Sequence, residues 1–491
     1  MKINKYRFIE LLFIFLFLWE FDLKSSAQIS GSLFMLPNNF YAQMTNPSYL
    51  RSDDAKELAI PGLAGFSFGN SASFKISDLI TINETGNPVI DFEHFYETGS
   101  TNNFVRENLN IPLLFFSTPV KKARLSFYYR ENVNAFSKFK MNAVEFLVNG
   151  NTNPEYRNYS SDEIKLFGVG YRDFTFGYAR EMNKKLNVGA HFKILFGSAF
   201  IEVENWEYGI ETSGTGQIVT LTSKGNGNMS IPLPIEITEN QRILKVNGDG
   251  AAAKYFGSYK NPGVAIDLGA TYKIDELSTF SVSVLDLGGI WFKDNTVDLL
   301  QKENLDFVGF DITNAVRYPG EGYIDPLELM RSTKEEIRNV FRPIADSSKM
   351  IKTLSPKTIL HYHYELSDFL WLGVTNQSSF RKNYVWNMLS LSAMQNWANL
   401  SVFENINLHG TSSVTFGGGI QYEGTYGQVF LAADNLSAFY HPANNKSFSL
   451  MFGFCFLLNH EKNIKWDKMN KNGRRKSKGK ASEFLPFYLE K

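Results

Sequence analysis

The sequence has a single cysteine and, after residue 27, no long apolar run. With Cys455 alone, no intrachain disulfide can form, and no metal or redox site can be built on a C-x-x-C pair. No stretch after residue 27 approaches the roughly 18 apolar residues that a membrane-spanning helix needs, and the mean hydropathy is −0.22. These absences exclude a disulfide framework and a helical membrane protein.

Aromatic residues are abundant by contrast. They make up 15% of the 491 residues, with 43 Phe and 23 Tyr, and outer-membrane β-barrels carry such an excess on their lipid faces. Within residues 174–197, apolar side chains recur at every second position: Phe174, Phe176, Tyr178, Leu186, Val188, Ala190, Phe192, Ile194 and Phe196. Since successive side chains of a strand point to opposite faces, this stretch predicts a hairpin with one apolar and one mostly polar face.

The polar face of this hairpin is expected to face a lumen. His191 and Lys193 are its polar candidates, and Phe192 between them is expected to face lipid. On this view Lys193→Leu should disturb assembly far less than Phe192→Arg.

The alternating pattern recurs in about 14 segments, many of them about 10–12 residues long. Tilted strands that cross a bilayer need about 9–11 residues, whereas strands of soluble proteins usually stop near 5–6. The links between segments are alternately short and long, as in outer-membrane barrels. The expected segments are 57–69, 110–118, 122–140, 163–180, 185–205, 262–275, 277–292, 356–366, 368–381, 384–395, 397–409, 412–423, 426–436 and 447–458.

The sequence therefore predicts an all-β fold, a transmembrane antiparallel β-barrel of about 14 strands over residues 57–458. Its longest outer loops are residues 206–261 and 293–355. In the second loop, Asp325 as a helix N-cap, Pro326 after it and Pro343 beyond predict short helices. A departure from alternation after Val284 predicts a β-bulge.

The two ends of the chain indicate its location. Residues 1–27 combine basic residues, a short apolar run and small residues before Gln28, which predicts a signal peptide. Residues 461–491 hold ten Lys/Arg and four Asp/Glu, a net charge of +6, without apolar periodicity. We expect residues 459–491 to be a basic, disordered tail. An even number of strands would leave both termini in the periplasm of an outer-membrane protein.

Residues 28–56 are too apolar for a freely solvated leader and lack strand alternation. Pro37 and Pro47 also remove ladder donors, which disfavours a central strand. Because a wide barrel is water-filled when left open, we expect this segment to fold inward as a plug. A disordered leader is the alternative.

Motifs that would indicate an enzyme are absent or lie in the wrong context. Gly65-Phe66-Ser67-Phe68-Gly69 matches G-x-S-x-G, yet it lies in an alternating strand rather than a strand-to-helix turn. His361, His363 and Glu365 share one face of a predicted strand, and such residues can bind zinc. Polar residues are expected on a lumen face in any case. We therefore predict lumen-lining roles for these three, with no metal, no cofactor and no catalytic site.

One segment resembles a known family. Asn46, Pro47 and Ser48 precede the first strand, as the N-P-A/S segment does in barrels similar to the fatty-acid transporter FadL. That resemblance implies an inward hatch. The overall plan, with "DLGGIW" at residues 286–291, more closely resembles an uncharacterised bacteroidete family related to the PorV and PorP/SprF-type barrels of type IX secretion and gliding. The chain departs from the pattern by continuing for about 30 residues after Leu458.

These resemblances imply two functions. The first is a non-enzymatic anchor or scaffold for secretion or surface-assembly components, which would bind periplasmic or secretion-machinery proteins through the basic tail. The second is a FadL-like transporter of hydrophobic or small amphipathic solutes. In both, the partners include outer-membrane lipid and exclude nucleic acid.

Overall fold

The structure, a computed structural model, describes most of the chain between residues 31 and 459. The described residues are 31–36, 38–149, 158–213, 218–233, 235–237, 243–246, 248–307, 334, 336–337, 340, 342–381, 384–409 and 413–459. The predicted signal peptide lies outside them, as does the tail beyond residue 459.

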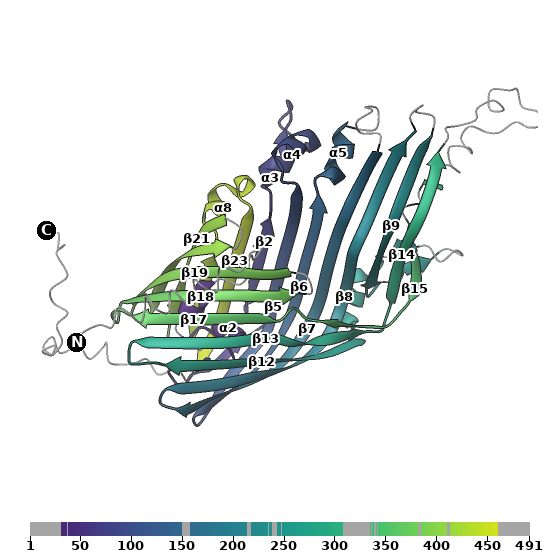
Figure 1. Cartoon of the computed structure of the whole chain (residues 1–491). Helices are drawn as coiled ribbons and strands as arrows, with labels where there is room; N and C mark the ends of the chain where they lie inside the picture. The colour runs from purple at the N-terminus through teal and green to yellow at the C-terminus, as the bar shows by residue number, and fades with distance from the viewer. Residues whose placement is uncertain are drawn as a thin grey trace, which may run out of the picture.

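Antiparallel strands follow one another around a closed ring (Figure 1). Taking β1 and β2 as one position, the register pairs of the described residues give 14 positions, so the predicted barrel of about 14 strands is confirmed. The circuit runs through β1 (Lys56–Ala59), β2 (Phe66–Ala72), β5 (Asn102–Val120), β6 (Ala123–Lys140), β7 (Asn158–Asn183), β8 (Leu186–Thr212), β12 (Asn261–Lys273), β13 (Ser278–Phe292), β17 (Lys357–Glu365), β18 (Leu370–Arg381), β19 (Tyr384–Trp397), β20 (Leu400–His409), β21 (Ser413–Glu423), β22 (Gly427–Ala433) and β23 (Ser447–Leu458).

The first strand differs from the prediction. Instead of one segment over residues 57–69, the chain forms β1 and β2, both of which pair with β5 and with β23. Between them, Gly62 and Gly65 have positive φ angles of 83° and 90°, a conformation that glycine adopts without steric cost. A turn therefore interrupts the strand while its two parts keep one place in the ring.

The two long loops are largely extensions of the sheet. Residues 206–261 and 293–355 contain β9 (Val219–Ser230), β14 (Thr296–Phe307), β15 (Ile344–Ser347) and β16 (Met350–Thr353), which pair onto β8 and β13 or onto one another. A separate hairpin joins β10 (Ile235–Ile237) and β11 (Ile243–Val246). Most of residues 325–343, where helices were expected, lies outside the described residues.

The ring has two unlike ends. At the short-turn end, brief turns such as residues 121–122 and 184–185 join neighbouring strands. The long-loop end carries α3 (Ile76–Leu79), α4 (Phe92–Thr98), α5 (Asn142–Asn149), α6 (Ala251–Gly257), α8 (Ser437–Tyr440) and η3 (Pro442–Asn444). Figure 1 shows α3, α4 and α5 beyond the ends of β5 and β6.

The two faces of the wall have opposite character. On β8 and β12 the large apolar side chains that face outward stay exposed, among them Phe192 at 49% and Val264 at 56%. The alternating positions, including His191 and Lys193, point inward and are buried. No described helix is long and apolar enough to cross a membrane.

Candidate functional site

Residues 31–36 and 38–49, which we call the inner segment, lie within the ring. They form η1 (Gly31–Met35) and α2 (Phe40–Thr45), and every residue of α2 is buried. Asn39 begins α2 as its N-cap, with its Oδ1 accepting from the backbone N–H groups of Tyr41 and Ala42. The segment packs into an apolar cluster with barrel residues from both halves of the chain: Phe115, Tyr128, Met394, Phe403, Phe430, Met451 and Cys455.

The inner segment is attached by side chains and not by a strand ladder. Within the described part of the chain, none of its residues has a register pair with a strand of the ring. Apart from packing, it is held by single hydrogen bonds such as Asn39 Nδ2 to Gln421 Oε1 at 2.7 Å and Ser283 Oγ to the Thr45 carbonyl at 3.0 Å. A segment held in this way can leave its site without breaking the sheet.

Asn46, Pro47 and Ser48 form a tight turn against β8 and β12. Asn46 Oδ1 accepts from the N–H and hydroxyl of Ser48 at 3.1 and 2.8 Å, a local turn that asparagine favours. The turn fits because two wall positions are glycines. A Cβ on Gly269 would lie 2.5 Å from Asn46 Oδ1, and one on Gly189 would collide with the Pro47 carbonyl.

Tyr49 ends the inner segment with a partly buried hydroxyl that donates to the Phe34 carbonyl at 2.7 Å. Burial raises the pKa of the Tyr49 phenol above its ordinary value, because the phenolate would lose its hydration. Tyr49 therefore remains a neutral donor that ties the two ends of the inner segment together.

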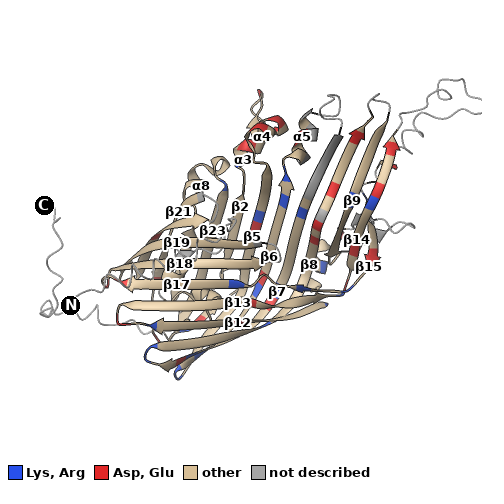
Figure 2. Ribbon diagram, in the orientation of Figure 1, with Lys and Arg blue, Asp and Glu red and all other residues tan. Residues whose placement is uncertain are grey.

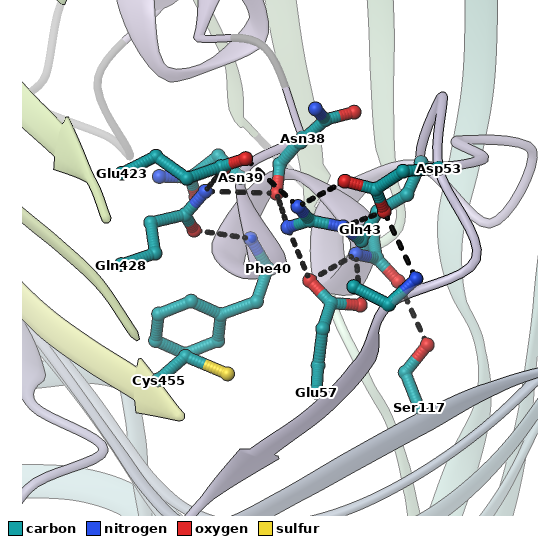
Figure 3. Close-up of polar contacts among 12 residues, drawn as sticks. Asn38, Asn39, Phe40, Gln43, Asp53, Glu57, Ser117, Glu423, Gln428 and Cys455 are labelled. Carbon is teal, nitrogen blue, oxygen red and sulfur yellow. Dashed lines mark hydrogen bonds and ion pairs between the residues drawn. The ribbon is translucent and has the colours of Figure 1, made fainter. Parts of the chain in front are cut away.

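An ion-pair cluster, which we call the anchor cluster, holds the chain where it passes from the inner segment into β1 (Figure 3). It consists of Arg51, Asp53, Glu57, Arg124 and Glu423. Arg51 contacts all three carboxylates, at 2.9 Å for Asp53 and Glu423 and at 3.3 Å for Glu57. Arg124, on β6, contacts the other oxygen of Glu57 at 3.1 Å.

Glu57 is the centre of the anchor cluster because it is fully buried and serves both arginines. It also accepts two hydrogen bonds from Gln43 Nε2 of α2, at 3.0 and 2.7 Å. On the other side, Gln428 Oε1 accepts from the Phe40 N–H at 3.4 Å, and its amide donates to the Asn38 carbonyl and to Glu423. The inner segment is thus fixed by charges and amides that come from opposite parts of the wall (Figure 3).

A second polar row, which we call the charge ladder, crosses the lumen face of β8, β12, β13 and β17. Lys193 lies 2.8 Å from Asp267 and 2.7 Å from Asp286, and Lys357 lies 3.2 Å from Asp286. His191 Nδ1 contacts Asp267 at 3.1 Å and the Tyr128 hydroxyl at 3.0 Å. Two cations face two carboxylates here, so the buried charges are balanced.

The predicted bulge is confirmed and has a role in the ladder. Leu268 pairs with Val284, but Ile266 pairs with Leu287, so Asp267 lies opposite the two extra residues of β13. Asp286 adopts a positive φ of 62° and its N–H donates to Asp267 Oδ1 at 2.8 Å. The bulge thereby directs the Asp286 carboxylate toward the lumen.

The lumen face of β17 carries His361, His363 and Glu365, as expected from alternation. His361 Nδ1 contacts the Thr375 hydroxyl at 2.9 Å, and the His363 ring stacks on Trp371 with centroids 5.4 Å apart. His363 Nε2 lies 3.8 Å from Glu365 Oε1. In the described part of the chain, no group of three or more His, Cys, Asp or Glu is arranged to hold a metal ion.

Cavities lie along the lumen between described residues. One, which we call the vestibule, is about 570 Å³ and lies at the short-turn end, between the inner segment and wall residues such as Lys184, Lys273 and Glu365. This volume falls in the range of small-molecule sites. Nearer the long-loop end are two small cavities of about 40 and 50 Å³.

The two small cavities share Arg106, Asn134 and Lys357. The 40 Å³ cavity has an aromatic wall: Phe136, Phe167, Tyr171, Phe200, Phe292 and Trp386. The 50 Å³ cavity is lined by amides, hydroxyls, the two cations and the apolar side chains of Phe68, Leu109 and Met451, and its described lining includes no carboxylate. Gln377 points into it with neither amide atom hydrogen-bonded within the described residues.

The structure thus separates the predicted site residues into three places. Asn46, Pro47 and Ser48 turn inside the ring, and His191 and Lys193 belong to the charge ladder. On β17, His363 and Glu365 line the vestibule, whereas His361 is buried against Thr375. Sequence reasoning missed the anchor cluster and the cationic cavities. Their partners are far apart in the chain, and only the charged residues within otherwise alternating strands gave a signal.

Comparison with known proteins gives a family. A family model described as "Family of unknown function (DUF5723)" matches residues 50–434. The chain belongs to the DUF5723 family. No curated protein matches it.

Several solved structures are similar to this DUF5723 chain. The toluene transporter TbuX of Ralstonia pickettii is 9% identical with a TM-score of 0.41, covering 86% of this chain and 93% of that one. A Pseudomonas aeruginosa FadL homologue is 10% identical with a TM-score of 0.43, covering 89% and 100%. The toluene transporter TodX of Pseudomonas putida is 8% identical with a TM-score of 0.38, covering 89% and 95%. At such identities and scores these matches assign no substrate, and none of them supports the expected kinship with PorV or PorP/SprF-type barrels.

Proposed function

We propose that this protein is a gated channel of the outer membrane, in which the inner segment is a movable plug and the solutes are small amphipathic anions. The observation that carries the proposal is the mode of attachment. A buried segment fills the ring but is held by side-chain contacts, so its release would open the lumen and leave the strand pairs intact.

The wall supports the membrane location. Charged residues such as Lys193 and Asp267 are buried inside, whereas the outward positions beside them are exposed and apolar, as a lipid-facing surface requires. By the rule for such barrels, the short turns face the periplasm and the long loops face outside. The chain would then enter and leave the barrel on the periplasmic side.

The small cavities support the proposed solute class. Arg106 and Lys357 line both cavities, although Lys357 also pairs with Asp286, which lines the 40 Å³ cavity. The 50 Å³ cavity adds amide and hydroxyl groups, and the 40 Å³ cavity adds the aromatic wall. Guanidinium and ammonium groups bind carboxylate or phosphate, and the aromatic rings would receive an apolar body. A cavity of about 50 Å³ holds only the anionic group, so passage requires the plug to move toward the vestibule.

The alternative scaffold function has less support. It depends on the basic tail, residues 459–491, nearly all of which lies outside the described residues. The described lumen has cavities on both sides of the plug, and a lumen of this kind favours transport.

The test is uptake by proteoliposomes of phenylacetate and of its neutral amide. We expect the anion to enter faster, and Arg106→Gln to slow the anion while leaving the amide unchanged, because only the anion uses the guanidinium. Arg180→Gln, at an exposed position near a short turn, is the matched control. Equal uptake of anion and amide, or equal effects of the two variants, would refute the proposed solute class.

A further inference from the structure

The long-loop end carries a small cap with its own core. Phe95, Met141 and Val144 are buried together, and the Phe95 ring lies 4.8 Å from Phe74, edge to face. This core fixes α3, α4 and α5 on the ends of β5 and β6 (Figure 1). Whatever projects from the cap is therefore held in a defined position.

A β-hairpin projects from this cap. Its strands are β3 (Ile80–Ile82) and β4 (Pro88–Ile90), paired with each other through Ile80↔Ile90 and Ile82↔Pro88. The turn is preorganised, because Asn83 Oδ1 accepts from the Thr85 and Asn87 N–H groups at 3.1 and 2.9 Å. The hairpin is thus a rigid platform.

One face of the hairpin is apolar and uncovered. Ile80, Ile82, Pro88 and Ile90 lie on the same face because alternate residues of paired strands share a side. We call these four residues the hairpin patch. The exposed fraction is 75% for Ile82 and 60% for Ile90, and no described residue covers the patch. A contiguous patch of exposed apolar side chains is typical of an interaction site.

The chain segment that carries the hairpin patch is acidic, and one lysine, Lys75, lies directly before it. Residues 76–98 contain five carboxylates, Asp78, Glu84, Asp91, Glu93 and Glu97, and neither Lys nor Arg. Figure 2 shows this acidic colouring on α4. A second copy of the chain would bring two surfaces of like charge together, and an anionic lipid surface would be repelled in the same way. The charge favours a cationic occupant.

The edge of the hairpin is suited to an extended partner. The Asp91 N–H donates to Leu79 O, and the Asn83 N–H donates to Asn87 O. In an antiparallel pair the bonded positions alternate, so the backbone groups of Ile82 point away from β4. An extended chain could add to that edge and place its alternate side chains on the patch.

We propose that the hairpin patch docks an extended, cationic segment of another protein whose alternate side chains are apolar. This interaction is independent of solute passage, because the patch lies on the cap and not in the lumen.

The test uses the full chain in nanodiscs of zwitterionic lipid and a fluorescent peptide of alternating Lys and Val. The controls are peptides of alternating Glu and Val and of alternating Lys and Ser. We expect saturable binding of the Lys–Val peptide alone, weakened by salt because the rim is charged. Equal binding of all three peptides, or none of the Lys–Val peptide, would overturn the proposal.

The variant that tests the location is Ile82→Asn with Ile90→Asn, which should weaken binding about tenfold or more. Ile351→Asn is the matched control, since Ile351 is 73% exposed on β16. Equal binding by the two variants would place the peptide elsewhere and overturn the proposal. So would chain dimerisation that the double variant abolishes, because the patch would then bind a second copy.

Discussion

Glu57→Gln is the substitution that should release the inner segment most readily. The change keeps the size of the side chain but removes the charge that faces both Arg51 and Arg124. It also replaces one of the oxygens that accept from Gln43 with an N–H donor. Because Glu57 is fully buried, water cannot replace the lost interactions.

The size of the effect follows from burial. Removing one partner of a buried ion pair costs about 3–5 kcal/mol. At about 1.4 kcal/mol for each factor of ten, the population in which the inner segment has left its site should rise roughly 10²- to 10⁴-fold. Glu423→Gln is the matched control, since Glu423 is 18% exposed and pairs with Arg51 but not with Arg124. Solvent screening limits its expected effect to about 1 kcal/mol or less.

Cys455 provides the assay without any added label site. It is the single cysteine of the chain, fully buried, and packs in the cluster that contains Phe40 of the inner segment. A membrane-impermeant maleimide should therefore react slowly with the wild type and much faster with Glu57→Gln. Heat-modifiable electrophoretic mobility would verify that the barrel itself stays folded. If Cys455 reacts at the same rate in the wild type and in Glu57→Gln, the anchor cluster does not hold the segment.

Three further substitutions test other parts of the structure. Gly269→Val should speed labelling of Cys455, since the new Cβ would lie 2.5 Å from Asn46 Oδ1 at an overpacking cost of about 1–3 kcal/mol. Gly69→Val should not change the labelling rate, because a Cβ there has nothing within 4 Å. Equal labelling rates for the two variants would contradict the close fit at Gly269. Phe192→Arg should reduce the free energy of unfolding in bilayers by about 2–4 kcal/mol relative to Phe192→Leu. Equal folded fractions of the two variants would refute the lipid-facing assignment. Lys193→Leu should also reduce the free energy of unfolding, by about 3–5 kcal/mol, while Lys193→Arg preserves it. If the leucine variant folds to the same extent as the wild type, the charge ladder does not stabilise the barrel.

The expectation for Lys193 shows what periodicity can and cannot predict. Alternation placed the side chain on the lumen face correctly, and from this a mild effect of Lys193→Leu was expected. The structure contradicts that expectation, because the ammonium group lies between Asp267 and Asp286. Those partners are 74 and 93 residues away in the chain, so their proximity depends on strand register and on the β13 bulge.

The strands themselves were predictable for a physical reason. A wall with opposite faces imposes period-two alternation on every strand, and each strand carries that signal alone. The cap and the anchor cluster lack such a local signal. Glu57 meets Arg124 across β5, whereas Arg51 meets Glu423 because the ring closes between β23 and β1. Nothing in their neighbouring sequence records these contacts. The break between β1 and β2 was missed because the alternation continues through Phe66 and Phe68.

A disulfide between the inner segment and the wall tests the gated channel most directly. A Cβ on Gly373 would touch Met35, so Met35→Cys with Gly373→Cys, in a Cys455→Ser background, should form a bond that locks the segment in place. We predict that oxidised proteoliposomes take up phenylacetate no faster than empty vesicles, and that a reductant restores uptake. Equal uptake with the bond formed and reduced would contradict the account, because solutes would then pass without movement of the inner segment.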